Sequence, residues 1–205
     1  SSDRVSARID SILTAYLPPN APGAVVIAER NEEIIFRRAY GMADLELEVP
    51  LKPEMLFRIG SVTKPMTAVA LGILAEEAQL GLDDLAVTYL PELGANYSEV
   101  TLWQLLSHTA GVRDVTGIEG YQVRKRYEVE PETMLDLLRD VPLEFPAGTR
   151  FAYSNTNYYL LGVIIERVTG VSYQEFLAQT IFDPTGMVAT RVDRPDSIIT
   201  NRVRG

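Results

Sequence analysis

The stretch from Ser61 to Gln79 places the strongest constraint on the fold. Its sequence, SVTKPMTAVALGILAEEAQ, predicts a helix whose apolar side chains cover most of its circumference. A helix that is apolar on nearly every side is normally a buried one. The chain therefore needs other elements that pack around residues 61–79.

The rest of the sequence supplies one β-hairpin and several more helices. Apolar residues at helical spacing predict a helix over 5–16, and residues 23–30 and 32–41 read as two strands that meet across Asn31-Glu32. We expect further helices within 101–111, 131–140, 156–170 and 172–182. This tally indicates an α+β fold. A two-stranded sheet is marginal by itself, so the outer edges of the hairpin look unfinished.

Local signals mark the ends of these helices. Thr101 and Gln104 form a capping-box pattern, and Ser172 with Glu175 repeats it. Pro131 suits a first helical turn. We expect Gly111 and Gly170 to close the helices that precede them.

Charge and composition exclude several classes of function. The formal net charge is −9 and the isoelectric point about 4.7, so a nucleic acid backbone would be repelled. The one tight basic cluster, Arg124-Lys125-Arg126, reads as a solvated stretch.

The chain has no cysteine and a single histidine, His108, which leaves no basis for a disulfide, a thiol nucleophile or a multi-histidine metal site. We expect no metal and no cofactor. No apolar run is long enough to span a membrane, and the compartment cannot be read from the sequence.

Ser61 and Lys64 form the first candidate for chemistry. Residues three apart lie on one face of a helix, so the hydroxyl and the amine can touch. The N-terminus of a helix favours an anion, and the backbone N–H of Ser61 can stabilise an oxyanion that forms when its hydroxyl attacks a carbonyl. Burial disfavours the charged form of an amine, so an apolar helix can turn a lysine into a base that activates a serine. The structural alternative is a helix-capping Ser61 with Lys64 reaching to water.

Tyr153-Ser154-Asn155 is the second candidate, because it brings a phenol and an amide to the start of a predicted helix. A phenol beside an amine can relay a proton, and an amide can hold a substrate carbonyl or the lysine.

The phrases that contain these residues resemble the serine beta-lactamase and penicillin-binding-protein superfamily. They are LFRIGSVTKPMTAVA, LGLDDLAVTYLPEL, TLWQLLSHTAGV, FPAGTRFAYSNTNYYLLGVIIERVTG and IFDPTGM, in this order along nearly the whole chain. The resemblance is closest to the class C beta-lactamase-like branch, which includes D-Ala-D-Ala carboxypeptidases and family VIII esterases. It implies a beta-lactamase-like fold, with an antiparallel sheet and a helical subdomain. We accordingly divide the chain into residues 1–50, residues 51–185 with both motifs, and a tail at 186–205.

The resemblance also implies roles. Ser61 is then the acylated nucleophile, Lys64 its base or proton shuttle, Tyr153 the second member of the relay and Asn155 a substrate-orienting amide. Whether Lys64 or Tyr153 takes the first proton stays open. His108 matches a phrase of the family but no catalytic role, and we interpret it as a structural histidine.

The third motif of the family, Lys-Thr-Gly or His/Trp-x-Gly on a strand beside the site, has no counterpart here. Val168-Thr169-Gly170 is its nearest likeness, but it falls at a helix end. Relatives continue where this sequence ends at NRVRG, so we expect an incomplete sheet and a C-terminal segment of the same protein as a partner.

The expected function is a serine acyl hydrolase that acts through an acyl-enzyme on a small molecule or peptide with an amide, lactam or ester carbonyl. The alternatives are a penicillin-recognising sensor that is acylated without turnover, and an inactive fragment. A periplasmic or secreted location would suit a cell-wall substrate, and a cytoplasmic one is also compatible.

Overall fold

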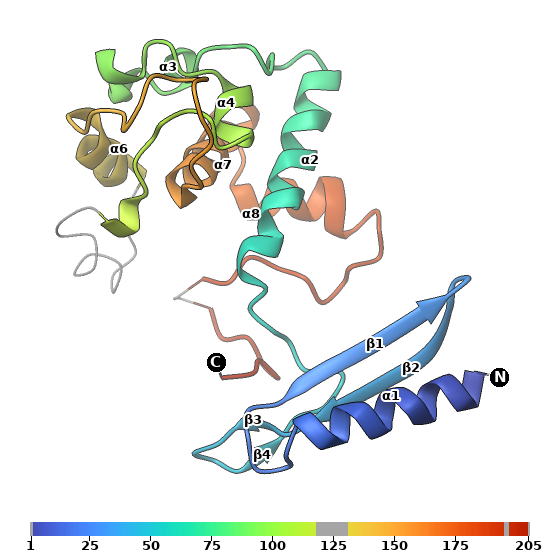
Figure 1. Ribbon diagram of the computed structural model, residues 1–205. Helices are drawn as coiled ribbons and strands as arrows, with labels where there is room; N and C mark the ends of the chain where they lie inside the picture. The colour runs from blue at the N-terminus through green and yellow to red at the C-terminus, as the bar shows by residue number, and fades with distance from the viewer. Residues whose placement is uncertain (1, 118–130, 195–196, 205) are drawn as a thin grey trace. The chain divides into compact units, whose positions relative to one another are not determined.

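The computed structural model describes residues 2–117, 131–194 and 197–204 (Figure 1). The chain forms two compact units, one of residues 1–59 with 193–205 and the other of residues 60–192. The cluster Arg124-Lys125-Arg126 lies outside the described residues. No helix in the described part of the chain is long and apolar enough to cross a membrane.

The predicted hairpin is confirmed in the first unit. Strand β1 (Ala24–Arg30) pairs antiparallel with β2 (Glu33–Tyr40) in a two-stranded sheet. Asn31 and Glu32 form the turn with φ angles of 53° and 64°. Positive φ at both central residues matches the right-handed twist of the flanking strands, although glycine is the usual second residue of such a turn.

Helix α1 (Ser2–Tyr16) is anchored to the hairpin by polar contacts. The hydroxyl of Ser6 donates to the carbonyl of Ile35 at 2.7 Å, and the phenol of Tyr40 donates to Asp10 at 2.6 Å. Strands β3 (Met42–Asp44) and β4 (Val49–Pro50) form a second small antiparallel pair.

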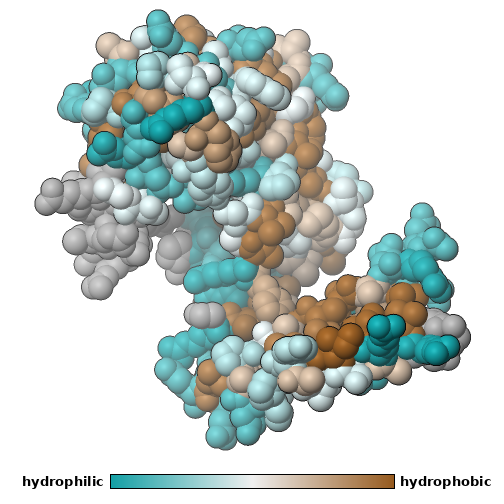
Figure 2. Space-filling view, in the orientation of Figure 1, coloured by the Kyte–Doolittle hydropathy of each residue, from teal (hydrophilic) through white to brown (hydrophobic). Residues whose placement is uncertain are grey.

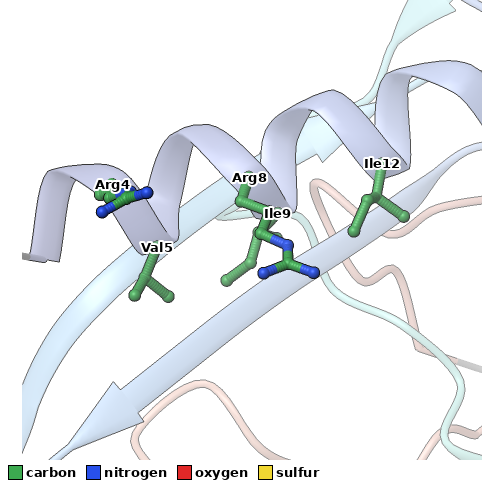
Figure 3. A pocket seen from close by; sticks show the side chains of 5 residues that line it. All are labelled: Arg4, Val5, Arg8, Ile9 and Ile12. Atoms are coloured by element: carbon green, nitrogen blue, oxygen red, sulfur yellow. The ribbon is translucent and has the colours of Figure 1, made fainter.

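The first unit keeps much apolar surface accessible, as the brown area over it in Figure 2 shows. Val5 and Ile12 on α1 are 42% and 51% exposed, and Ile27 and Ile34 on the hairpin are each 54% exposed. A hollow along α1 is lined by Arg4, Val5, Arg8, Ile9 and Ile12 (Figure 3).

The second unit is helical and contains the main core. Its α-helices are α2 (Thr63–Glu76), α3 (Ala86–Tyr89), α4 (Leu102–Leu106), α6 (Pro131–Arg139), α7 (Asn155–Thr169) and α8 (Tyr173–Leu177). Short 3₁₀ turns occur at Gly60–Val62, Pro91–Leu93, Ala95–Tyr97 and Val115–Gly117, and a π-helical turn at Ala178–Phe182 follows α8. Helix α7 packs against α2, α4 and α8 through residues that include the fully buried Leu160, Leu161 and Ile164.

Helix α2 differs from the expectation of burial on nearly every side. It begins at Thr63, after a 3₁₀ turn that contains Ser61. One face, with Thr67, Ala70, Leu71 and Leu74, is buried, whereas Val69 is 53% exposed and Lys64 is half-buried. Many of its outward positions are alanine or glycine, which carry little apolar area, so a single buried face holds most of the apolar surface.

The end of α4 also corrects the sequence analysis. The capping box of Thr101 and Gln104 is confirmed, but the helix ends at Leu106 and Gly111 does not cap it. His108 takes the left-handed conformation that glycine usually provides, with φ of 57°. The N–H of His108 bonds to the carbonyl of Leu105, and that of Thr109 to the carbonyl of Gln104, which completes a Schellman motif.

Candidate active site

Ser61 and Lys64 lie together at the head of α2, as their spacing predicts. Gly60 precedes them with φ of 51°, a conformation that favours glycine, and turns the chain into the helix. The Nζ of Lys64 donates to the Oγ of Ser61 at 3.1 Å. Ser61 is exposed, so its hydroxyl is open to a reacting molecule.

Tyr153 and Asn155 join this pair from the start of α7. The phenolic oxygen of Tyr153 lies 2.7 Å from the Oγ of Ser61, and either oxygen can donate. The Oδ1 of Asn155 accepts from the Nζ of Lys64 at 2.9 Å. The structure thus brings all four predicted site residues into one hydrogen-bonded group.

Core packing explains how residues 92 positions apart meet. Helices α2 and α7 are in contact, and Leu71 and Leu74 on α2 are as fully buried as Leu160 and Ile164 on α7. Ser61 and Asn155 each lie at the N-terminal end of one of these helices, so packing the two apolar faces holds both ends near each other. The 3₁₀ turn with Ser61 and the extended Ser154 lead into these two helices, and the side chains of Ser61 and Tyr153 meet there.

The phenol of Tyr153 is electrostatically prepared to lose its proton. The adjacent Lys64 side chain, followed by the hydroxyl of Ser61, lowers the pKa of Tyr153 below its ordinary value of 10.0. The Nζ of Lys64 also lies 4.8 Å from the centroid of the Tyr153 ring and 5.5 Å from that of Tyr158. A cation at these distances stabilises the phenolate and is attracted to the ring faces.

The ring of His108 packs against the ring of Tyr153. Their ring centroids are 4.5 Å apart, and the Nδ1 of His108 accepts from the backbone N–H of Ser154 at 3.2 Å. The amide nitrogen of Asn157 lies 3.2 Å from the same ring nitrogen, so the neutral tautomer with its proton on Nε2 fits both donors. Burial, followed by the positive charge of Lys64, lowers the pKa of His108.

Asp114 is the member of the group that the sequence analysis missed. It lies in the loop after α4, and its Oδ2 accepts from both the backbone N and the Nδ2 of Asn155, at 2.7 and 3.0 Å. Burial raises the pKa of Asp114, but the hydrogen bonds from Asn155 and Thr116 outweigh this effect and lower the pKa overall. No spacing rule singles out Asp114, because its partner is 41 residues away.

The donor types at this site suit proton transfer. Among the described residues, no group of three or more His, Cys, Asp or Glu side chains is arranged to hold a metal ion. The hydroxyl, amine, phenol and amide instead form a continuous set of donors and acceptors around one exposed oxygen. Such a set can remove a proton from that oxygen and return it to a leaving group.

Comparisons with known proteins point in the same direction. The family model described as Beta-lactamase matches residues 9–205. Penicillin-binding protein 4* of Bacillus subtilis (strain 168) is 36% identical over 169 residues, which cover 82% of this chain and 37% of that protein. Esterase EstB of Burkholderia gladioli is 33% identical over 201 residues, which cover 89% of this chain and 50% of that protein.

The solved structure of a penicillin-binding protein from Bacillus halodurans has a TM-score of 0.78 and 27% identity, and covers 88% of this chain and 55% of that one. This similarity confirms the beta-lactamase-like fold expected from the sequence, with mixed helices and small antiparallel sheets. The chain spans about a third to a half of the length of these two curated relatives.

Proposed function

The chain belongs to the beta-lactamase family, within the superfamily of serine beta-lactamases and penicillin-binding proteins, and on this premise we propose that it is a serine acyl hydrolase acting through an acyl-enzyme. The observation that carries the proposal is the position of the Ser61 Oγ, 2.7 Å from the phenolic oxygen of Tyr153 and 3.1 Å from the Nζ of Lys64. An exposed hydroxyl between a phenol of lowered pKa and an amine is an activated nucleophile.

In the proposed acylation step, the Tyr153 phenolate takes the proton of Ser61 while Oγ bonds to the substrate carbonyl carbon. The carbonyl electron pair moves to its oxygen, and the backbone N–H of Ser61 at the head of α2 is our candidate donor to this oxyanion. When the tetrahedral intermediate collapses, the Tyr153 phenol gives its proton to the departing amine or alkoxide, which leaves an ester on Ser61.

Deacylation repeats these steps with water. The Tyr153 phenolate takes a proton from water, whose oxygen attacks the ester carbonyl, and the same proton returns to Ser61 as the acid leaves. Lys64 donates to Ser61 and Asn155, and its positive charge favours the phenolate. In this scheme Tyr153 is the base, and the charge of Lys64 stabilises its deprotonated form.

The substrate class that we propose is a carbonyl compound of the kind the relatives' names suggest, an ester or a penicillin-like lactam. We infer this from the esterase and the penicillin-binding protein among the relatives. The site residues contact the reacting oxygen, not the rest of a substrate, so they do not by themselves select between the two.

Incubation with a chromogenic lactam and with a nitrophenyl ester tests the proposal. We expect release of the chromophore and, by mass spectrometry, an acyl group on the peptide that contains Ser61. Ser61→Ala should remove both signals, whereas Ser98→Ala, at an exposed turn, should keep them. Steady release supports a hydrolase, and a single equivalent of label supports the sensor alternative. The absence of any label on wild-type Ser61 contradicts the proposal.

A further inference from the structure

The carboxylate of Asp114 is completely engaged by donors. Its Oδ2 accepts from the backbone N and the Nδ2 of Asn155, and its Oδ1 accepts from the backbone N and the hydroxyl of Thr116, at 2.8 and 2.6 Å. Four donors to one carboxylate fix its orientation. The neighbouring loop is held as well, because the hydroxyl of Thr156 accepts from Val115 N and donates to Arg113 O, both at 2.8 Å.

Asn155 is consequently placed between a group that only accepts and a group that only donates. A carboxylate has no proton to give, and a lysine ammonium has no lone pair to offer. The amide satisfies both neighbours only when its NH₂ faces Asp114 and its oxygen faces Lys64. The two charged neighbours therefore select one of the two amide orientations.

We propose that Asp114 is a positioning residue for the reaction at Ser61. Its carboxylate accepts from the backbone N–H and the side-chain NH₂ of Asn155, and these two hydrogen bonds keep the Oδ1 of Asn155 directed at Lys64. The chain of contacts runs from Asp114 to Asn155, from Asn155 to the Lys64 ammonium, and from that ammonium to the Ser61 oxygen. This inference rests on the proposed function for its effect on rate.

Loss of the carboxylate removes one of the two charged neighbours that select the productive orientation, and the acceptor that holds the NH₂ group in place. A rotated amide would present its NH₂ to the ammonium, so that a donor would face a donor, and Lys64 would lose one of its two side-chain acceptors. The ammonium would then be free to leave the Ser61 oxygen. Small displacements of such groups are costly for catalysis, of order 10²-fold for about 1 Å.

Asp114 also has a purely structural contact that must be separated from this role. Ser154, the residue before α7, makes no side-chain capping bond, and the carboxylate of Asp114 occupies the first backbone N–H of that helix instead. An Asp114→Ala variant therefore loses a helix cap together with the amide contact. Asn155→Ala, in contrast, removes the amide and leaves the backbone N–H for Asp114.

A double-mutant cycle uses this difference. The acylation rate of Ser61 is measured in the full chain for wild type, Asp114→Ala, Asn155→Ala and the double variant. We expect Asp114→Ala to slow acylation about 10- to 100-fold in the wild-type background and to have no further effect when Asn155 is already Ala. In the Asn155→Ala background, the remaining effect of Asp114→Ala on the melting temperature reports the lost cap without the amide contact.

Asp136→Ala is the matched control. Asp136 is an acidic residue on α6 whose ion-pair partner is Arg139, which is not one of the site residues. It should leave the acylation rate at the wild-type value. An unchanged rate in Asp114→Ala, or an equal slowing in both backgrounds of the cycle, overturns the inference.

If Asp114→Ala does not fold, Asp114→Asn keeps the shape with a weaker, uncharged acceptor and should be slowed. A wild-type rate in Asp114→Asn also overturns the inference.

A second readout does not depend on activity. The side-chain amide of Asn155, identified by its loss in Asn155→Ala, is followed in ¹⁵N NMR spectra. We expect its NH₂ resonances to shift toward those of free amides in Asp114→Ala and to stay in place in Asp136→Ala. A shift without any labelling of wild-type Ser61 would refute the proposed hydrolase but support the positioning contact. Unchanged resonances in Asp114→Ala overturn the inference whatever the activity.

Discussion

Tyr153 has the clearest individual property in the candidate site, because two neighbours lower the pKa of its phenol. The Lys64 side chain and the Ser61 hydroxyl both favour the phenolate, and a base must be deprotonated to act. Tyr89 has the opposite environment. Burial, followed by the hydrogen bond to Asp84, raises the pKa of Tyr89 to about 12.

These pKa directions predict the pH dependence of acylation. The rate should rise with pH as Tyr153 ionises, and the midpoint of this rise should lie below the ordinary tyrosine pKa of 10.0. Tyr153→Phe should lower the rate about 10²- to 10⁴-fold and abolish this rise, since it removes the titrating group and keeps the ring. Stopped-flow measurements of acylation between pH 6 and 10 test this expectation.

Tyr89→Phe serves as the control for the pH profile, because its phenol titrates above the measured range. It should retain the wild-type curve. A Tyr153→Phe variant that keeps the same rise with pH would show that Tyr153 is not the base and would assign that role to Lys64.

The sequence predicted part of this site for physical reasons that differ between residues. The contact of Ser61 with Lys64 follows from helix geometry, since residues three apart share a face. The approach of Tyr153 and Asn155 depends on how α7 packs against α2, and only a resemblance to a known superfamily could indicate it. The contact of Asp114 with Asn155 and that of the His108 ring with the Tyr153 ring escaped prediction because both arise from loop conformations that no local pattern encodes.

Some helix ends are set by residues close in sequence, and others depend on contacts with residues far along the chain. The capping box of α4 was predicted correctly because its two bonds join residues three apart. The end of α4 was predicted wrongly because the usual preference for glycine pointed to Gly111, whereas His108 adopts the left-handed conformation. The His108 ring contacts Tyr153 and Tyr158, which lie in the segment that enters α7 and in α7 itself.

Gly111 nevertheless has a strict requirement of its own. Its φ is 74°, and a Cβ at this position would lie 2.2 Å from the carbonyl oxygen of Phe145. Gly111→Ala should therefore destabilise the protein by about 2–5 kcal/mol, the sum of a left-handed conformation and an overpacked contact. Chemical denaturation monitored by circular dichroism measures this change.

Gly72→Ala is the matched substitution, and we expect it to change the stability in the opposite direction. Gly72 lies inside α2, and a Cβ there would meet no atom within 4 Å. Alanine is preferred over glycine in a helix by roughly 0.5–1 kcal/mol, so this variant should gain stability. Equal effects of the two substitutions would contradict the structural difference between the two sites.

Buried apolar side chains are distributed unevenly over the chain. All members of the main core cluster lie between Ala70 and Phe182, in the unit formed by residues 60–192. In the other unit, the buried apolar residues of the described part are Phe36, Ala43 and Leu51. Since a fully buried large apolar side chain contributes about 1.5–3 kcal/mol, the two units should differ in local stability.

Hydrogen exchange can compare two helices of equal length. Helices α1 and α7 each have 15 residues, but α1 is mostly accessible, whereas seven residues of α7 are buried. We expect the amides of α1 to exchange roughly 100-fold or more faster than those of α7, because local opening exposes far less apolar surface. Mass spectrometry of peptides from the two helices gives the ratio. Similar protection of both would contradict the prediction.

Much of the architecture could be predicted from the sequence because its elements have strong local patterns. The hairpin, the apolar helices and the family resemblance all agree with the structure and the comparisons. The sequence analysis placed residues 186–205 in a separate tail, and it did not predict that residues 193–205 join the first 59, as in the bridge between Leu56 and Arg202. The third motif and a further C-terminal segment stay predictions.

The contact between α2 and α7 has one more consequence. Ser61 lies just before one helix and Asn155 begins the other, so the buried apolar side chains of the two helices act as a spacer that sets the distance between these ends. A methylene added or removed in that spacer, at Leu71 or Ile164, would widen or narrow the gap without touching a polar atom. The rate of the proposed reaction should therefore respond to substitutions in the apolar core, which carries no group that handles a proton.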